Sequence, residues 1–329
     1  MDAKITKERL SRMLSYDWLK IVGIAVAAII FWTLVFTVSA TRITAAQQFT
    51  VINYFGNAAT TNTSFSADLN KAFRDGLFSY EVLEITEVDV GGNEEMGSTL
   101  MQTRVATDEG DVVFVPNLAD PDGVYEINGE TLQDTYVQSL VRGYRWNLEE
   151  LDRNKSGGFF NRLETFLNQY YGDYQTGTLN KELVKQDFLT RIAKNKDKRF
   201  KKDEQIEQGI LDEIARVEKY RAALIEFDGY LESGLVTLPT TQVKNVETGE
   251  VLWEGVFSIN ICPDPDAMSN LTYITGYLEE VKDNSGGTGY KLSAKDMNVA
   301  VMRFDSVEES FEFESLLYIN HVIRTGKSK

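Results

Sequence analysis

The chain has 329 residues with 34 basic and 50 acidic side chains, a net charge of −16 at pH 7, and 43% of its residues are hydrophobic. This acidic balance argues against a nucleic-acid partner, because phosphate binding requires a basic face. With one cysteine, Cys262, and one histidine, His321, the chain cannot form an internal disulfide, and it lacks the residues of zinc sites and histidine-dependent triads. We therefore expect no metal, no cofactor and no enzymatic activity.

The first element is an uncharged apolar segment over residues 21–40. A helix of that length rises about 30 Å, the hydrocarbon thickness of a bilayer. The first twenty residues hold five basic and three acidic side chains, so the positive-inside bias assigns them to the cytoplasm. The alternative is a cleaved signal peptide, but its apolar region is usually only about 7–15 residues long. We predict a cytoplasmic segment 1–20, a transmembrane helix 21–40 in the cell membrane, and an extracytoplasmic domain 41–329.

After the anchor, strand and helix patterns alternate. Apolar β-branched runs indicate strands, and the spacing of Leu69, Phe73 and Leu77 indicates a helix face. The patterns predict a strand over 48–55, a helix capped by Ser66, a strand over 80–90, a helix over 96–106 and a strand over 112–115. This alternation is typical of a parallel α/β sheet covered on both faces.

From about 131 to 231 the sequence becomes helical, and we predict a helix-rich lobe there. A basic run at 194–202 is interpreted as a solvated helix end, with contact to acidic lipid or an acidic partner as the alternative. The last third returns to strands over 235–246, 251–262 and 298–304, a hairpin whose glycine-rich loop covers 285–289, and a closing helix over 307–323.

Two groups of acidic residues suggest chemistry. Asp108, Glu109 and Asp111 surround a glycine, and paired carboxylates can hydrolyse glycosides, but such neighbours are expected by chance among 50 acidic residues. Four further residues match the first, third, fifth and sixth positions of a calcium loop: Asp152, Asn154, Ser156 and Gly157. The twelfth position is Leu163 and the nearest acid, Glu164, comes one residue late, so we interpret this segment as a plain helix–loop–helix turn.

Aromatic and amide residues gather where predicted strands end. In open parallel sheets ligands bind beyond the carboxyl ends of the strands, and aromatic faces with amides suit a neutral polar ligand such as a sugar. The predicted site joins residues after the first strand, after the third strand and around the strand ending near 262: Tyr54, Phe55, Asn57, Asn117, Trp253, Asn260 and Asp264. For each of them the alternative is an ordinary core or surface position.

The chain resembles the extracellular solute-binding proteins of bacterial ABC importers, which have a type II periplasmic-binding fold. The resemblance lies in segments 49–54 and 66–78, in 100–116 (LMQTRVATDEGDVVFVP), in 129–141 (GETLQDTYVQSLV) and in Asp305-Ser306 before the last helix. It implies a two-lobed α/β domain, a bound solute and importer permease subunits as partners. The chain departs from the family in keeping a transmembrane helix and in its unmatched central helical region, which leaves a rebuilt or reduced second lobe open.

These patterns together predict a membrane-anchored solute-binding protein for a neutral or cationic polar ligand, with carbohydrate as the expected class. One alternative is a non-catalytic structural or accessory subunit of a cell-envelope complex that has lost ligand binding. A carboxylate-based glycosidase is the other alternative.

Overall fold

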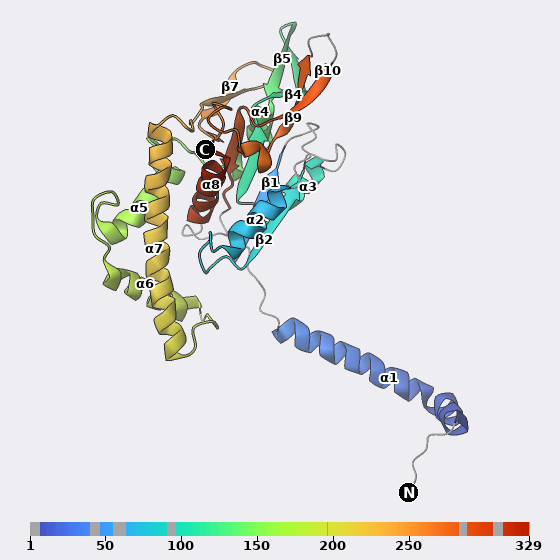
Figure 1. Ribbon diagram of the computed structural model, residues 1–329. Coiled ribbons are helices and arrows are strands. Elements are labelled where there is room, and N and C mark those ends of the chain that lie inside the picture. The colour runs from blue at the N-terminus through green and yellow to red at the C-terminus, as the bar shows by residue number, and fades with distance from the viewer. Residues whose placement is uncertain are drawn as a thin grey trace. The chain divides into compact units, whose positions relative to one another are not determined.

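The computed structural model describes residues 7–39, 47–54, 64–90, 97–195, 197–282, 288–304 and 312–328. The chain forms two units, Met1–Ile43 and Thr44–Lys329. Helix α1 (Lys7–Ser39) makes up the first unit (Figure 1). Its stretch Trp18–Phe36 is long and apolar enough to cross a membrane, and none of it is buried against protein. The predicted apolar helix of membrane-spanning length is therefore confirmed.

The second unit is built on a five-stranded sheet of order β2-β1-β3-β11-β8. Strands β1, β2 and β3 pair in parallel, whereas β11 is antiparallel to both of its neighbours. The strands are β2 (Glu84–Asp89), β1 (Gln48–Asn53), β3 (Val112–Pro116), β11 (Met297–Val301) and β8 (Ile259–Asn260). All five residues of β3 are buried, as its uninterrupted apolar run predicts for a strand covered on both faces.

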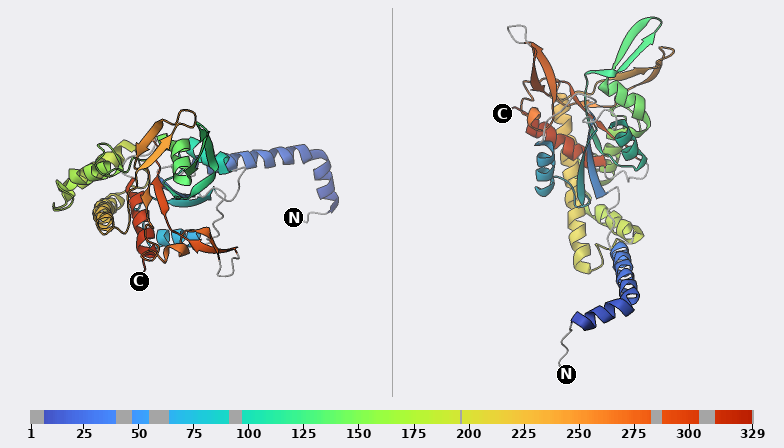
Figure 2. Two further views of the ribbon diagram at one scale, coloured as in Figure 1. Left: turned by 90° about the horizontal axis from the view of Figure 1, so that it is seen from above. Right: turned by 90° about the vertical axis from the view of Figure 1, so that its right-hand side faces the viewer.

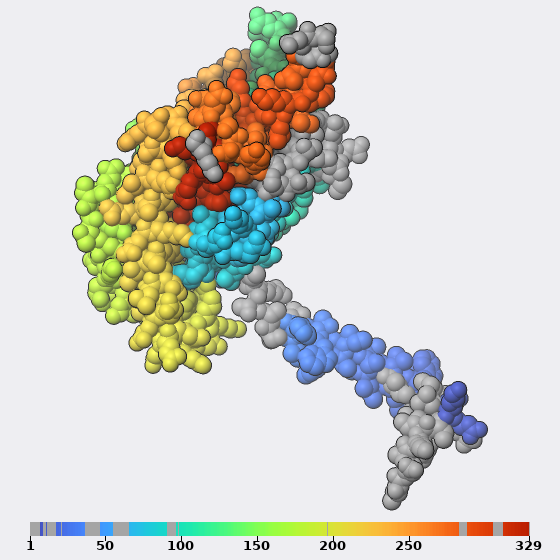
Figure 3. All heavy atoms as spheres, viewed as in Figure 1, coloured from blue at the N-terminus to red at the C-terminus, as the bar shows by residue number. Residues whose placement is uncertain are grey.

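Helices cover both faces of this sheet. On one face, Phe49 and Phe114 share a core cluster with residues of five helices: α2 (Ser64–Arg74), α5 (Phe159–Tyr171), α6 (Lys181–Asn195), α7 (Asp203–Glu232) and α8 (Glu312–Gly326). On the other face, Ile52 and Val113 pack with α3 (Gly97–Ala106) and α4 (Tyr136–Tyr144). Figure 3 shows α7, α8 and α2 side by side on the first face. The predicted mixed α/β class is confirmed.

Three antiparallel hairpins project beyond the carboxyl ends of the parallel strands (Figure 2). They are β4 (Ala119–Ile127) with β5 (Glu130–Thr135), β6 (Thr241–Lys244) with β7 (Val251–Gly255), and β9 (Tyr277–Lys282) with β10 (Thr288–Ser293). The predicted helical start at 131 is wrong, because residues 130–135 form β5 and α4 begins at Tyr136. The predicted strand 235–246 is shorter, and residues 307–311 of the predicted last helix lie outside the described residues.

The turn of the first hairpin is an Asn-Gly pair. Asn128 and Gly129 both have positive φ, 54° and 82°, as a type I′ turn requires. A β-carbon at Gly129 would meet no atom within 4 Å, so only the backbone conformation disfavours a larger residue there.

We expect Gly129→Ala to lower the free energy of unfolding by about 1–2 kcal/mol, because an L-residue with a β-carbon resists the left-handed region. Gly229→Ala is the matched control, since Gly229 lies inside α7 with equally open space around it. There alanine should stabilise by about 0.5–1 kcal/mol. Thermal unfolding midpoints of the two variants should therefore move in opposite directions, and a common direction would contradict this account.

Candidate functional site

The carboxyl edge of the sheet contains a topological switch point. From β1 the chain places β2 on one side and β3 on the other, so the strand order reverses between β1 and β3. Tyr54 follows β1 at this edge, and Asn117 follows β3. Open α/β sheets bind ligands in the crevice beyond such a point, so this edge is where a binding site is expected.

Asp296 organises the polar groups at this edge. Its backbone lies in the left-handed region, with φ 51°. Its carbonyl oxygen accepts hydrogen bonds from the Asn117 backbone N–H and the Asn298 side-chain amide, both at 2.9 Å. Its carboxylate accepts one from the Asn260 amide at 3.1 Å. Asp296 thus gathers three amide groups at the carboxyl edge of the sheet.

Beside Asn117 the surface opens into a cavity of about 180 Å³. The neutral pocket, as we name it, is formed by ten residues from five parts of the chain: Asn117, Thr135, Val137, Gln138, Pro239, Thr240, Thr241, Gln242, Ser258 and Asn298. None of the ten is charged, although 26% of the whole chain is. Eight carry an amide or a hydroxyl group, so the neutral pocket offers hydrogen bonds without a net charge.

Hydrogen bonds fix the walls of the neutral pocket. Thr135 caps α4 in a reciprocal capping box with Gln138, whose side-chain amide also donates to the Gln242 carbonyl at 2.8 Å. Ser258 donates its hydroxyl to the Asn298 Oδ1 at 3.0 Å, and both residues are almost fully buried. These bonds hold helix α4, the start of β6 and the sheet edge in one arrangement before any ligand arrives.

Three groups of the neutral pocket remain available. Among the described residues, the side-chain amide of Asn117 and the hydroxyls of Thr240 and Thr241 form no hydrogen bond. An amide supplies two donors and an acceptor, and each hydroxyl supplies a donor and an acceptor. Polar groups positioned by a rigid wall but unpaired themselves are suited to binding a ligand.

The predicted site residues fall into different surroundings. Asn117 lines the neutral pocket, and Asn260 lies behind it, bonded to Asp296 and accepting from the Cys262 N–H. Tyr54 packs edge-to-face on Tyr144, 6.5 Å between ring centres, and burial raises its pKa above the usual value.

Two more predicted residues lie apart from the neutral pocket. Trp253 is half-buried on β7, against the core cluster of α3 and α4. Asp264 is exposed and caps the Asp266 N–H in a turn. Phe55 and Asn57 lie outside the described residues.

The sequence interpretation missed most of the neutral pocket. Thr240, Thr241 and Gln242 form an uncharged polar run after Pro239, a signal that was readable. Asn298 was visible as a polar residue within the otherwise apolar run 297–302. Ser258 offered no such signal, because only tertiary contact pairs it with Asn298.

The two acidic groups serve other contacts. Asp111 accepts a hydrogen bond from the Thr50 backbone N–H at 2.6 Å, and Glu109 forms an ion pair with Arg104. In the segment resembling a calcium loop, Leu163 is buried in the core, and Glu164 pairs with Arg153 at 3.1 Å. Within the described ranges, no group of three or more His, Cys, Asp or Glu side chains is arranged to hold a metal ion.

Comparisons of the chain with models of protein families, with curated proteins and with solved structures find no match.

Proposed function

We propose that this chain is a membrane-anchored solute-binding protein whose domain faces away from the cytoplasm and whose neutral pocket binds a small, uncharged polar molecule of the carbohydrate class. One observation supports this most: an acidic protein has ten uncharged residues around a cavity at the carboxyl edge of its sheet. The resemblance to importer binding proteins adds delivery of the solute to a permease as the expected role.

The chemistry of the neutral pocket selects the ligand class. An anionic ligand would need an arginine or lysine clamp, and a cationic ligand would need a carboxylate; the lining of the neutral pocket contains neither. Amides and hydroxyls match the alternating donors and acceptors of sugar hydroxyls. A volume of about 180 Å³ equals roughly six water molecules, which suits a single sugar ring.

The two-lobed binding fold belongs to this proposal as well. Its support is the reversal of strand order between β1 and β3, with the neutral pocket at the carboxyl edge beside it. In place of a second large sheet, the domain has the α5–α7 helices and three hairpins. We therefore interpret the second lobe as a reduced one, in which the start of β6 forms the wall opposite the sheet edge.

A thermal-shift screen of the full chain in nanodiscs tests the proposal. The panel contains neutral monosaccharides, polyols, sugar acids and amino acids. A ligand that binds only the folded state stabilises it by about 2.7 kcal/mol at a hundredfold excess over Kd. We expect a neutral sugar or polyol to raise the unfolding midpoint by several degrees and the sugar acids to leave it unchanged. Stabilisation by anionic compounds alone would contradict the proposal.

Thr241→Val tests the neutral pocket itself. Valine matches threonine in shape but removes a hydroxyl that has no partner among the described residues, so binding should weaken about tenfold, equivalent to about 1.4 kcal/mol. Thr190→Val is the matched control, because Thr190 lies on α6 and bonds only its own helix. Isothermal titration with the ligand found in the screen gives both affinities. Equal affinities of the two variants would show that the ligand binds elsewhere.

A second candidate function, an accessory subunit of an envelope complex, is favoured by the hairpins. They expose large apolar side chains: Val124, Val251, Leu252, Leu278, Val281 and Tyr290. Grouped apolar exposure indicates contact with another protein. In that case no compound of the panel would stabilise the chain, and Leu252→Asp would reduce the size of the complex solubilised from native membranes.

A further inference from the structure

The loop between α6 (Lys181–Asn195) and α7 concentrates positive charge on an acidic domain. Four described lysines lie in the last turn of α6 and in this loop, are exposed, and form no ion pair among the described residues: Lys194, Lys198, Lys201 and Lys202. We call these residues the basic tip. The neighbouring acids are Asp197, which pairs with Arg199 at 2.8 Å, and Asp203 and Glu204 in the first turn of α7. The dipole of α7 favours the negative charge of these two acids at the start of the helix.

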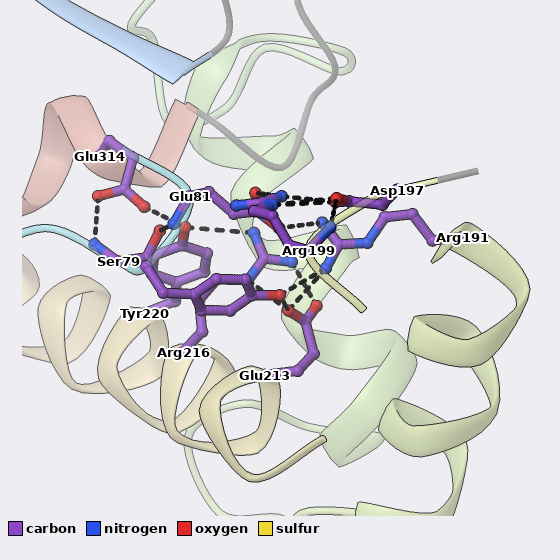
Figure 4. Close-up of polar contacts among 10 residues, drawn as sticks. Ser79, Glu81, Arg191, Asp197, Arg199, Glu213, Arg216, Tyr220 and Glu314 are labelled. Carbon is purple, nitrogen blue, oxygen red and sulfur yellow. Dashed lines mark hydrogen bonds and ion pairs between the residues drawn. The ribbon is translucent and has the colours of Figure 1, made fainter. Parts of the chain in front are cut away.

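A network of partly buried ion pairs clamps the basic tip to the sheet domain (Figure 4). Glu81, which is 3% exposed, accepts from Arg191 at 2.9 Å and from Arg199 at 2.6 Å. Glu213 accepts from Arg191 at 2.9 Å, from the Tyr80 hydroxyl at 2.6 Å and from Arg216. Because Arg199 lies between Lys198 and Lys201 in sequence, these bonds hold the basic tip against residues 80 and 81.

This clamp locates the basic tip at the amino edge of the sheet. Two residues after Glu81, the Leu83 N–H donates to the Gln47 carbonyl at 2.8 Å, directly before β1. The chain therefore enters the domain from α1 beside the basic tip, and Figure 3 shows this end of α7 protruding from the domain. Seven residues separate Ser39, the end of α1, from Gln47, and they reach at most about 25 Å.

The tether and the charge distribution define which surface meets the bilayer. With α1 in a membrane, the amino edge of the sheet must stay within about 25 Å of the end of that helix. An anionic surface repels the acidic remainder of the domain and attracts the lysines, and both forces act within a Debye length of about 8 Å at physiological salt. We propose that the basic tip rests on anionic phospholipid headgroups of the membrane that holds α1.

This contact would place the neutral pocket far from the bilayer. Helix α7 has 30 residues and is about 45 Å long. It starts at the basic tip and ends at Glu232, shortly before Thr237 pairs with Asn260 at the carboxyl edge. The neutral pocket therefore lies at the end of the domain opposite the basic tip, remote from the bilayer in this contact. The inference rests on the membrane anchor of the proposed function, but not on ligand binding.

A fluorescence experiment on the full chain tests the contact. Lys198→Cys provides one labelling site, because the native Cys262 is buried and burial raises the pKa of its thiol to about 12. The labelled chain is placed in nanodiscs of phosphatidylglycerol and phosphatidylcholine containing a headgroup nitroxide lipid as quencher. Glu126→Cys, on the exposed end of the β4–β5 hairpin, is the reference site.

We expect quenching at position 198 to be at least about threefold stronger than at position 126, and to disappear in about 0.5 M salt or in pure phosphatidylcholine, because the attraction is electrostatic. Equal quenching at both positions, or quenching independent of the anionic lipid, would overturn the proposal.

A charge reversal supplies the matched comparison. The triple change Lys194→Glu, Lys201→Glu and Lys202→Glu should reduce quenching at position 198 to the level in phosphatidylcholine. The triple change Lys282→Glu, Lys291→Glu and Lys295→Glu on the β9–β10 side alters the net charge equally and should leave quenching unchanged. Loss of quenching in both would mean that net charge, not the basic tip, controls the contact. Thr241→Val should not affect quenching, which separates this test from that of ligand binding.

Discussion

Replacing Arg216 with alanine is expected to lower the free energy of unfolding by about 3–5 kcal/mol, because it removes an arginine that pairs with a buried carboxylate. The Arg216 side chain is 3% exposed and binds Glu213, which is 6% exposed. Burial by itself raises the pKa of Glu213, but Arg216 and Arg191 outweigh burial and hold that pKa below its usual value. Arg216 also donates to the Tyr220 hydroxyl, which bonds Glu314 of α8.

The measurement is the thermal unfolding midpoint of the full chain, which should fall by roughly 10 °C at about 2–4 °C per kcal/mol for a domain of this size. Arg324→Ala is the control, since Arg324 pairs with Glu226 at 2.7 Å but is 57% exposed. Exposed pairs contribute less than about 1 kcal/mol. Similar losses in the two variants would mean that the network around Arg216 contributes no more than a surface pair.

Replacing Asp111 with asparagine is expected to change how stability depends on pH. Burial raises the pKa of this carboxyl to about 7, although the hydrogen bond from the Thr50 N–H opposes the shift. Because the folded pKa lies above the ordinary value near 3.9, the folded state favours the protonated form. This contribution is fully present below about pH 3.9 and is lost progressively as pH rises from there to about 7.

Between pH 5 and pH 8 the wild-type chain should therefore lose up to about 3 kcal/mol through Asp111 alone. Asparagine keeps an oxygen that accepts the hydrogen bond from the Thr50 N–H, but its side chain cannot ionise. The stability of the Asp111→Asn variant should therefore fall less over the same pH range. Unfolding midpoints at pH 5, 6, 7 and 8 measure the difference between the two slopes. Asp266→Asn, at an exposed aspartate, should keep the wild-type slope. Parallel curves for wild type and Asp111→Asn would contradict the role of burial.

Local sequence patterns predicted the elements whose cause is local. Residues 21–39 form part of one helix because a helix satisfies every backbone group of an uncharged apolar segment internally. The alternation from β1 to β3 was readable because strand and helix periodicities recur every two and about 3.6 residues. The Asn128-Gly129 turn was equally local and was overlooked in favour of helical periodicity, although two consecutive positive φ angles are what this pair adopts most readily.

The candidate site depended on contacts that no local pattern encodes. Asn117 and Asn260 were predicted from strand ends, and Asp296 brings them together across 179 and 36 residues of chain, through its carbonyl oxygen and its carboxylate respectively. Thr241 reaches the same cavity because Gln138 bonds the backbone of Gln242 more than one hundred residues away. Trp253 has the composition of a stacking residue, yet its strand pairing turns it toward the core.

Hydropathy, charge and periodicity act over a few residues, so the sequence alone was enough to predict a membrane-length helix and an acidic α/β domain. Tertiary structure decided the strand order, the insertion of β11 between β3 and β8, the uncharged lining of the neutral pocket and the burial of Glu81 and Arg216. The physical reason is that strand pairing and burial are settled by contacts between distant segments. The same asparagine or arginine side chain is exposed to solvent in one packing arrangement and buried in another.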